Sequence, residues 1–238
     1  SRLEHRMVRL LALAAVACAE PPPAVPDTAP EPVAPEPVVP QPPPPPEFTS
    51  SVRPLNDAER TAMTGITWRP GCPVPLDDLV RVEVSHHDFE GGVRQGALVV
   101  RADTADAIVA ALAAAFAEGF PIERMEPIVA FGGSDDASMD ANNTSAFNCR
   151  AVTGGTRYSE HSYGHAVDVN PAQNPYISSS GRTVLPAAAA DFVDRAAPRP
   201  GMLFADSALV ASLVGAGWGW GGAWSSTRDF QHLSANGR

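Results

Sequence analysis

A proline-rich stretch divides this chain into two parts with very different capacities to fold. Residues 21–46 contain fourteen of the chain's 25 prolines, separated mainly by Glu, Val and Ala. Such a sequence offers few side chains that can pack, and it favours an extended polyproline II conformation that acts as a semi-rigid spacer. We therefore predict a Pro-rich disordered linker over residues 21–50. About 190 residues follow it, which is enough for one domain with its own core.

The residues before the linker are typical of an export signal. Arg9 precedes an apolar run over residues 10–17 that is far too short to cross a bilayer. Cys18 follows small residues of the kind that precede a lipidated cysteine, although Ala15 stands where Leu is usual. We predict a signal over residues 1–20 and an extracytoplasmic protein. Two outcomes stay open, which are secretion and anchoring to the cell envelope through a lipid on Cys18.

The cysteines agree with export. The chain has three, and lipidation or removal of Cys18 leaves Cys72 and Cys149 as an even pair. In an exported protein such a pair is expected to form a disulfide, because that environment is oxidising.

The charge distribution argues against nucleic acid as a partner. The net charge is −10, no Lys occurs, and the 17 basic residues are Arg scattered along the chain without a cluster. A nucleic-acid-binding surface needs concentrated positive charge, which is missing here. We expect no nucleic acid partner, a monomer, and membrane contact only through a lipid at Cys18.

Hydrophobic periodicity in residues 51–238 predicts an α+β domain. Residues 79–84 and 96–100 read as two strands of a β-hairpin. An Ala-rich helix is expected over residues 105–118, capped by Asp103 or Thr104 and stopped by Gly119 and Pro121. Further along, we expect a strand over 122–131, a loop or short helix over 134–147, a short strand over 167–169, a helix over 206–215 and a turn with a strand over 218–224. The fold class is a small antiparallel sheet with flanking helices.

Two separated clusters carry the residues of a metallohydrolase. Residues 159–168 read SEHSYGHAVD and contain His161 and Asp168, whereas Asp229 and His232 lie sixty residues further on. Two His and one Asp are three protein ligands for a tetrahedral Zn²⁺, whose fourth position is left for water. The remaining carboxylate can then serve as a base.

The spacing within each cluster restricts how the residues can meet. His161 and His165 are four apart, but Gly164 and the pattern after it favour a turn that enters a strand. On that strand His165 and Asp168 lie on opposite faces, so we expect His165 to point away from the metal. Asp229 and His232 also lie on opposite faces of a flat strand, so a local irregularity is required if both serve one site.

These motifs resemble a known family. SxHxxGxAxD followed by DxxH is similar to the zinc peptidoglycan peptidases, which include VanY-type D-alanyl-D-alanine carboxypeptidases and L-alanyl-D-glutamate endopeptidases. Residues 142–150, 170–171 and 174–176 look like neighbouring family segments, and the resemblance covers roughly residues 70–235. It implies a fold related to the hedgehog signalling domain and to other D-Ala-D-Ala metallopeptidases.

The resemblance also implies a role for each site residue. His161, Asp168 and His232 match the zinc ligands, Asp229 matches the general base, and Arg150 matches a family arginine that stabilises the oxyanion or binds a substrate carboxylate. Ser159 opens the motif and is expected to orient the loop beside the substrate. Two positions depart from the family pattern, because many carboxypeptidase relatives have Glu in place of Asp229 and an aromatic residue in place of Leu233.

The implied activity is hydrolysis of peptidoglycan stem peptides. Asp229 would take a proton from the attacking water and return it to the leaving amine. Among the activities that the resemblance implies, we slightly favour a D-alanyl-D-alanine carboxypeptidase. An endopeptidase of the L-alanyl-D-glutamate type is the first alternative, and a non-catalytic zinc-containing cell-wall-binding domain is the second, although the presence of Asp229 counts against it.

Overall fold

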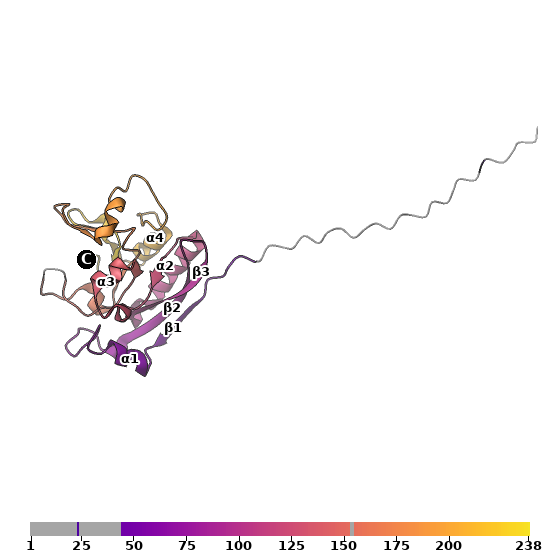
Figure 1. Cartoon of the computed structure of the whole chain (residues 1–238). Coiled ribbons are helices and arrows are strands. Elements are labelled where there is room, and N and C mark those ends of the chain that lie inside the picture. The colour runs from indigo at the N-terminus through magenta and orange to yellow at the C-terminus, as the bar shows by residue number, and fades with distance from the viewer. Residues whose placement is uncertain (1–22, 24–43, 153–154) are drawn as a thin grey trace, which may run out of the picture. The chain divides into compact units, whose positions relative to one another are not determined.

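The computed structural model describes residues 23, 44–152 and 155–238. Residues 45–238 form one compact unit (Figure 1). The predicted signal, Cys18 and most of the predicted linker lie outside the described residues. Within the described residues, no helix combines the length and the apolar character needed to cross a membrane.

An antiparallel sheet of long strands forms one side of the unit. Strands β2 (Leu79–His87) and β3 (Val93–Arg101) pair along their whole length and confirm the predicted hairpin. Strand β1 (Ser50–Pro54) adds to the other edge of β2, so the order is β1-β2-β3. The sequence did not predict β1, whose first residue, Ser50, was assigned to the linker.

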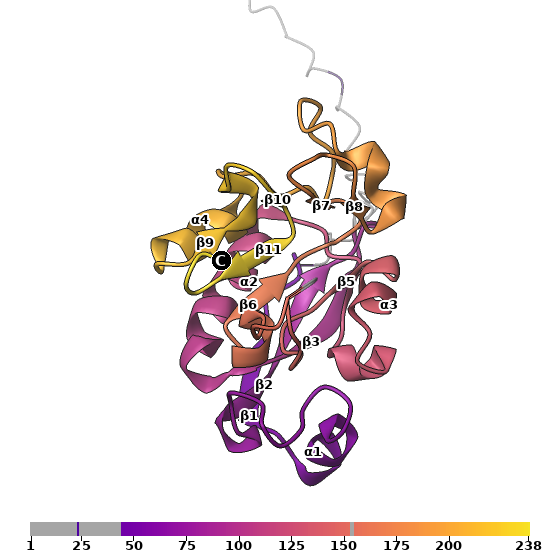
Figure 2. The same cartoon turned by 90° about the vertical axis from the view of Figure 1, so that its left-hand side faces the viewer.

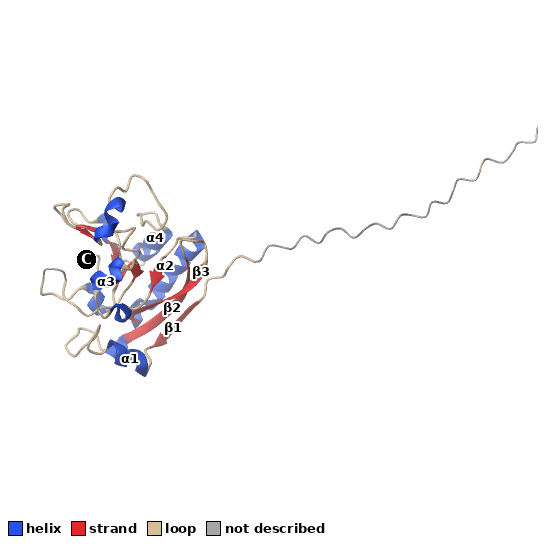
Figure 3. Ribbon diagram, viewed as in Figure 1, coloured by secondary structure: helices blue, strands red, loops and turns tan. Residues whose placement is uncertain are grey.

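Helix α2 (Ala105–Glu118) covers this sheet and confirms the predicted helix (Figure 3). It buries Ile108 and Leu112 against β2 and against helix α4 (Ala208–Gly215). The helix ends at Gly119, whose φ of 72° is in the left-handed region that glycine enters without steric cost.

The rest of the unit is built from much shorter elements (Figure 2). Strands of two or three residues form two further antiparallel sheets, ordered β10-β7-β8 and β6-β11-β9. These strands are β6 (Ala166–Asp168), β7 (Tyr176–Ile177), β8 (Val184–Leu185), β9 (Gly219–Trp220), β10 (Arg228–Asp229) and β11 (His232–Ser234). Two short helices, α1 (Asp57–Met63) and α3 (Asp135–Asp140), lie outside these sheets.

One core joins the long and the short elements. Val82 and Leu98 of the large sheet, with Ile108 of α2, pack in the same buried cluster as Val167 of β6 and Leu233 of β11. The short strands are therefore anchored on the large sheet and its helix. The α+β class with small antiparallel sheets and few helices is confirmed, while the relation to hedgehog-type folds stays a prediction.

The strand predicted over residues 122–131 is wrong for most of its length. Within this range only β4 (Arg124–Met125) is a strand, and it pairs in parallel with β5 (Asn143–Thr144). Residues 128–131 instead form a 3₁₀ helix that starts after Pro127. Proline removes a backbone N–H donor and fixes φ, which ends strand pairing and suits the start of a helical turn.

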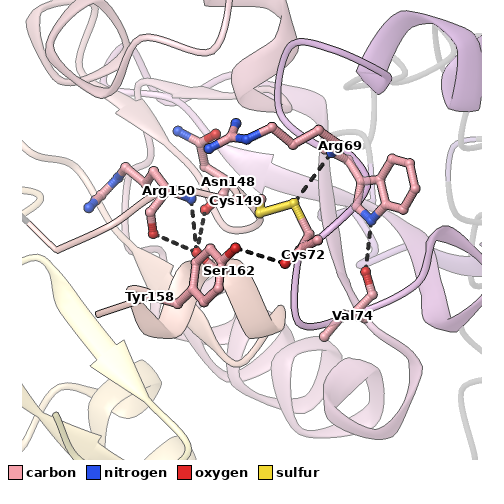
Figure 4. Close-up of a disulfide and its surroundings, with 10 residues drawn as sticks. Arg69, Cys72, Val74, Asn148, Cys149, Arg150, Tyr158 and Ser162 are labelled. Atoms are coloured by element: carbon pink, nitrogen blue, oxygen red, sulfur yellow. Dashed lines mark hydrogen bonds between the residues drawn. A yellow bond between two sulfur atoms is a disulfide. The ribbon is translucent and has the colours of Figure 1, made fainter. Parts of the chain in front are cut away.

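The expected disulfide between Cys72 and Cys149 is present (Figure 4). It joins residues 77 positions apart and so ties the segment after α1 to the segment that leads to Arg150. In the chain-entropy model a loop of this size corresponds to a stabilisation of about 4 kcal/mol.

Candidate metal centre

The pairing of two short strands brings the two sequence clusters together. In β6 and β11, Asp168 lies directly opposite His232, and Val167 lies opposite Leu233. Because side chains alternate along a strand, Val167 and Leu233 enter the core while Asp168 and His232 point to the other face. Asp168 is held from its other side by backbone hydrogen bonds with Ser145 in both directions.

A helical turn supplies the third residue. His161 lies in a 3₁₀ helix over Glu160–Tyr163, which ends at Gly164 with a φ of 68°. A Cβ at Gly164 would lie 2.5 Å from the backbone nitrogen of Arg101, so this turn packs tightly on the end of β3. Thr104 does not cap α2 through its side chain as expected, and instead its hydroxyl donates to the carbonyls of Arg101 and Gly164.

The polar atoms of His161, Asp168 and His232 converge within 4.8 Å of one another. Nδ1 of His161 donates to the carbonyl of Ala146 at 2.6 Å, and Nε2 of His232 donates to the carbonyl of Arg238 at 2.9 Å. The other ring nitrogens, Nε2 of His161 and Nδ1 of His232, therefore face each other at 3.2 Å. They lie 3.1 and 2.9 Å from the Asp168 carboxylate.

This arrangement requires a positive charge between the three groups. Burial by itself would lower the pKa of His232, but hydrogen bonding to Asp168 and the charges of Asp168 and Asp229 raise it to about 9. Burial would raise the pKa of Asp168, yet His161 and His232 hold it below its ordinary value. A proton on His232 or a bound cation satisfies the cluster, and two imidazoles with one carboxylate suit Zn²⁺. The three residues that the sequence predicted as ligands could thus hold a metal ion.

Asp229 adjoins this cluster from a different strand. It ends β10, and a bend at residues 230–231 separates it from His232 in β11, which is the local irregularity that the spacing required. Its Oδ1 is buried and has no hydrogen-bond partner among the described residues. Burial raises the pKa of Asp229 to about 7, and the charge of Asp168 acts in the same direction.

Arg150 reaches the same cavity from the segment after the disulfide. Its guanidinium forms an ion pair with Asp135 of α3, and its backbone N–H donates to the hydroxyl of Ser162. Burial lowers the pKa of Arg150, while the charges of Asp168 and Asp229 oppose this shift. The sequence did not predict the role of Asp135, because the segment around it showed only a concentration of acidic residues.

Ser159 and His165 take different places in the motif. Ser159 is buried at the start of the 3₁₀ helix, where its hydroxyl accepts a hydrogen bond from the backbone of His161 at 3.4 Å. His165 lies outside the group of candidate ligands, with its Nε2 3.4 Å from Asp103.

A groove of about 300 Å³ opens beside the candidate ligands. Three arginines line it, which are Arg150, Arg157 and Arg238. Its acidic lining residues are Glu160, Asp168 and Asp229. Its wall also contains side chains that sequence reasoning did not assign to the site, namely Val152, Tyr158, Tyr176, Trp224 and Asn236. Tyr176 was noted only as part of a family-like segment, and Trp224 only as part of a Trp-rich turn.

Comparison with known proteins gives one finding that bears on this site. No curated protein and no solved structure matches the chain. Residues 153–235 match a family model described as D-alanyl-D-alanine carboxypeptidase. The match covers less than half of the chain, but it contains Asp229 and all three residues that could hold the metal. It supports a peptidase of the D-alanyl-D-alanine carboxypeptidase family.

Proposed function

We propose that this chain is a zinc-dependent peptidase that hydrolyses peptidoglycan stem peptides as a D-alanyl-D-alanine carboxypeptidase. The observation that carries the proposal is the convergence of His161, Asp168 and His232 within 4.8 Å, with Asp229 in the same cavity. The Oδ1 of Asp229 has no hydrogen-bond partner among the described residues. A structural metal site needs no such carboxylate, whereas a hydrolytic site needs a base.

His161, Asp168 and His232 would hold the zinc. When bound there, zinc would supply a Lewis acid that polarises the scissile carbonyl and makes water a better nucleophile. The hydrogen bonds from the two imidazoles to the carbonyls of Ala146 and Arg238 fix the ring orientations and the tautomers that bind metal.

Asp229 would act as the general base and then as the general acid. In the metal-free protein burial raises the pKa of Asp229 to about 7, so this carboxylate is more basic than an ordinary Asp and suits a group that accepts a proton from the attacking water and returns it to the leaving amine. Its Oδ1 is free of competing hydrogen bonds from the described residues, so a water molecule or a substrate amine can take that position.

Arg150 would bind a substrate carboxylate or the oxyanion. The planar guanidinium suits both, because each needs paired N–H donors. The terminal carboxylate is favoured because Arg157 and Arg238 also line the groove and make it attractive to an anionic peptide end. Ser159 would keep the His161 turn in place beside the substrate.

The proposed site of action is outside the cytoplasm. The disulfide between Cys72 and Cys149 supports this location, since such bonds persist in oxidising compartments. Peptidoglycan stem peptides are found there and are the proposed partner.

Mass spectrometry of muropeptides incubated with the zinc-loaded protein tests the proposal. Loss of a single terminal D-Ala is the expected result. A cut inside the stem would replace carboxypeptidase by endopeptidase. Unchanged muropeptides, together with retained zinc and binding to peptidoglycan, would instead identify a non-catalytic wall-binding domain.

A further inference from the structure

A second, smaller cavity lies against the candidate metal centre. Its volume is about 130 Å³, and it shares Arg150, Asp168, Tyr176 and Asp229 with the main groove. This volume equals roughly four water molecules, which is enough for an unbranched side chain. Asp136, Met139, Leu185 and Gln231 line this cavity but not the main groove.

Gln231 is a buried polar residue of this cavity, and the proposed mechanism does not use it. Its side chain is 2 % exposed, and its Oε1 has no hydrogen-bond partner among the described residues. The contact that its Nε2 makes is with the sulfur of Met139 at 3.8 Å, which is a weak acceptor. A buried polar group without a good hydrogen-bond partner destabilises the folded state, so an apolar side chain at this position would make the fold more stable. A ligand that donates a hydrogen bond would satisfy the carboxamide.

The charge of the cavity specifies the ligand further. Of the four aspartates that line the cavity, Asp135 is paired with Arg150, Asp168 belongs to the candidate metal centre and Asp229 is the proposed base. Asp136 is exposed on α3 and forms no ion pair within the described part of the chain. Its carboxylate is therefore left to attract a cation, while Leu185 and Tyr176 supply apolar contact for a methylene chain.

We propose that this cavity is a specificity subsite for a substrate residue with a side-chain ammonium group, which donates to Gln231 and is attracted by Asp136. The inference rests on the proposed function, because that function brings a stem peptide to the adjoining metal centre. In a peptide that ends in D-Ala-D-Ala, the residue before this pair is the nearest one with a long side chain. A diamino acid at that position would place its ammonium group in the cavity.

Two pentapeptides of the form L-Ala-γ-D-Glu-X-D-Ala-D-Ala test the subsite, one with L-Lys and one with L-norleucine at X. Mass spectrometry first shows whether the zinc-loaded protein cleaves them. If it does, the ratio of the two kcat/KM values is measured, and if it does not, the ratio of the two Kd values is measured by calorimetry. Cleavage tests the proposed function, whereas the ratio tests the subsite in either case.

The wild type should favour the lysine peptide by about tenfold or more, as expected for hydrogen bonding to a charged group. Gln231→Met keeps the side-chain volume and should bring the ratio to within about twofold of one. Gln95→Met is the matched control, because Gln95 lies in β3 away from this cavity, and it should keep the wild-type ratio.

Asp136→Asn gives an independent test on a residue that is exposed on α3 and lies outside the buried core. It should lower the preference for lysine, and it decides the question if Gln231→Met fails to fold in a thermal unfolding assay. A wild-type ratio of the two kcat/KM or Kd values close to one would overturn the subsite. An undiminished preference for lysine in folded Gln231→Met would overturn the role of Gln231 in it.

Discussion

The large sheet with helix α2 and the region of short strands are stabilised in different ways. β2 and β3 are nine residues each and pair over their whole length, so backbone hydrogen bonds and apolar side chains define them. The site strands β6 and β11 have three residues each, and β10 has two. Strands this short are not stable alone. The site therefore depends on the large sheet and α2, which carry none of its candidate ligands.

Specific contacts join the two regions. Val167 and Leu233 enter the core formed by the large sheet and α2. The Gly164 turn packs on the end of β3, and the disulfide fixes the approach to Arg150. Changes in the short region should therefore affect chemistry and metal binding first, while changes at the contacts should affect stability.

The largest effect is expected at Asp229. Asp229→Asn removes the base but keeps the shape of the site, so turnover of stem peptides should fall about a thousandfold while zinc is retained. Steady-state kinetics with metal analysis measures both quantities. Asp106→Asn, on the exposed face of α2, is the scaffold control and should leave turnover unchanged. Unchanged turnover in Asp229→Asn would show that another group is the base.

The pH dependence of metal binding should be the next largest effect. In the metal-free protein His232 holds a proton below its pKa of about 9, and a metal ion must displace it. The apparent affinity for zinc should thus rise about tenfold per pH unit between pH 7 and 9, and then level off. Competition with a chelator of known affinity measures this slope. A flat profile would mean that His232 is not protonated before metal binds.

The same raised pKa predicts how metal-free stability changes with pH. Since the folded pKa of His232 is higher than the ordinary 6.5, its protonation stabilises the folded state. This contribution is complete below pH 6.5 and is lost as the pH rises through about 9. Denaturant unfolding of chelator-treated protein across this range checks the sign, and a gain in stability towards pH 9 would contradict it.

A pair of glycines tests the contact between the regions. Gly164 and Gly119 have φ angles of 68° and 72°, so an alanine at either position pays the same left-handed backbone cost of about 1–2 kcal/mol. A Cβ at Gly119 meets nothing within 4 Å, whereas one at Gly164 would lie 2.5 Å from the nitrogen of Arg101. Gly164→Ala should therefore lower the free energy of unfolding more than Gly119→Ala. Equal losses would mean that the turn does not need its close approach to β3.

The smallest effect is expected at His165. His165→Ala should leave zinc content unchanged, because this side chain lies outside the group formed by His161, Asp168 and His232. His161→Ala, in the same motif, should lose zinc. Loss of zinc from His165→Ala as well would mean that His165 takes part in metal binding.

The long elements could be predicted from sequence because their signals are local. The alternation over residues 79–84 and the Ala-rich run ended by Gly119 give β2 and α2 directly. β1 was missed because its residues, SSVRP, follow the proline-rich run and show little alternation. Its pairing with β2 is a tertiary contact. The strand over 122–131 failed because Pro127 changes the backbone in the middle of an apolar run.

The residue types and spacings of the site could be predicted from the sequence, but the contacts between distant segments could not. The faces of a strand explain why His165 is outside the group, and the spacing of Asp229 and His232 required the bend that the structure shows. The ion pair of Arg150 with Asp135 and the buried position of Gln231 depend on packing between distant segments. No periodicity or motif in the chain records such contacts.

Two short strands and one turn bring His161, Asp168 and His232 together as a candidate metal centre. Elemental analysis of the dialysed protein, beside the Asp168→Ala variant, tests it most directly. We expect one zinc per wild-type chain and none in the variant. A wild-type protein that holds no zinc after exposure to the metal, or a variant that retains it fully, would show that these three residues do not form a metal centre.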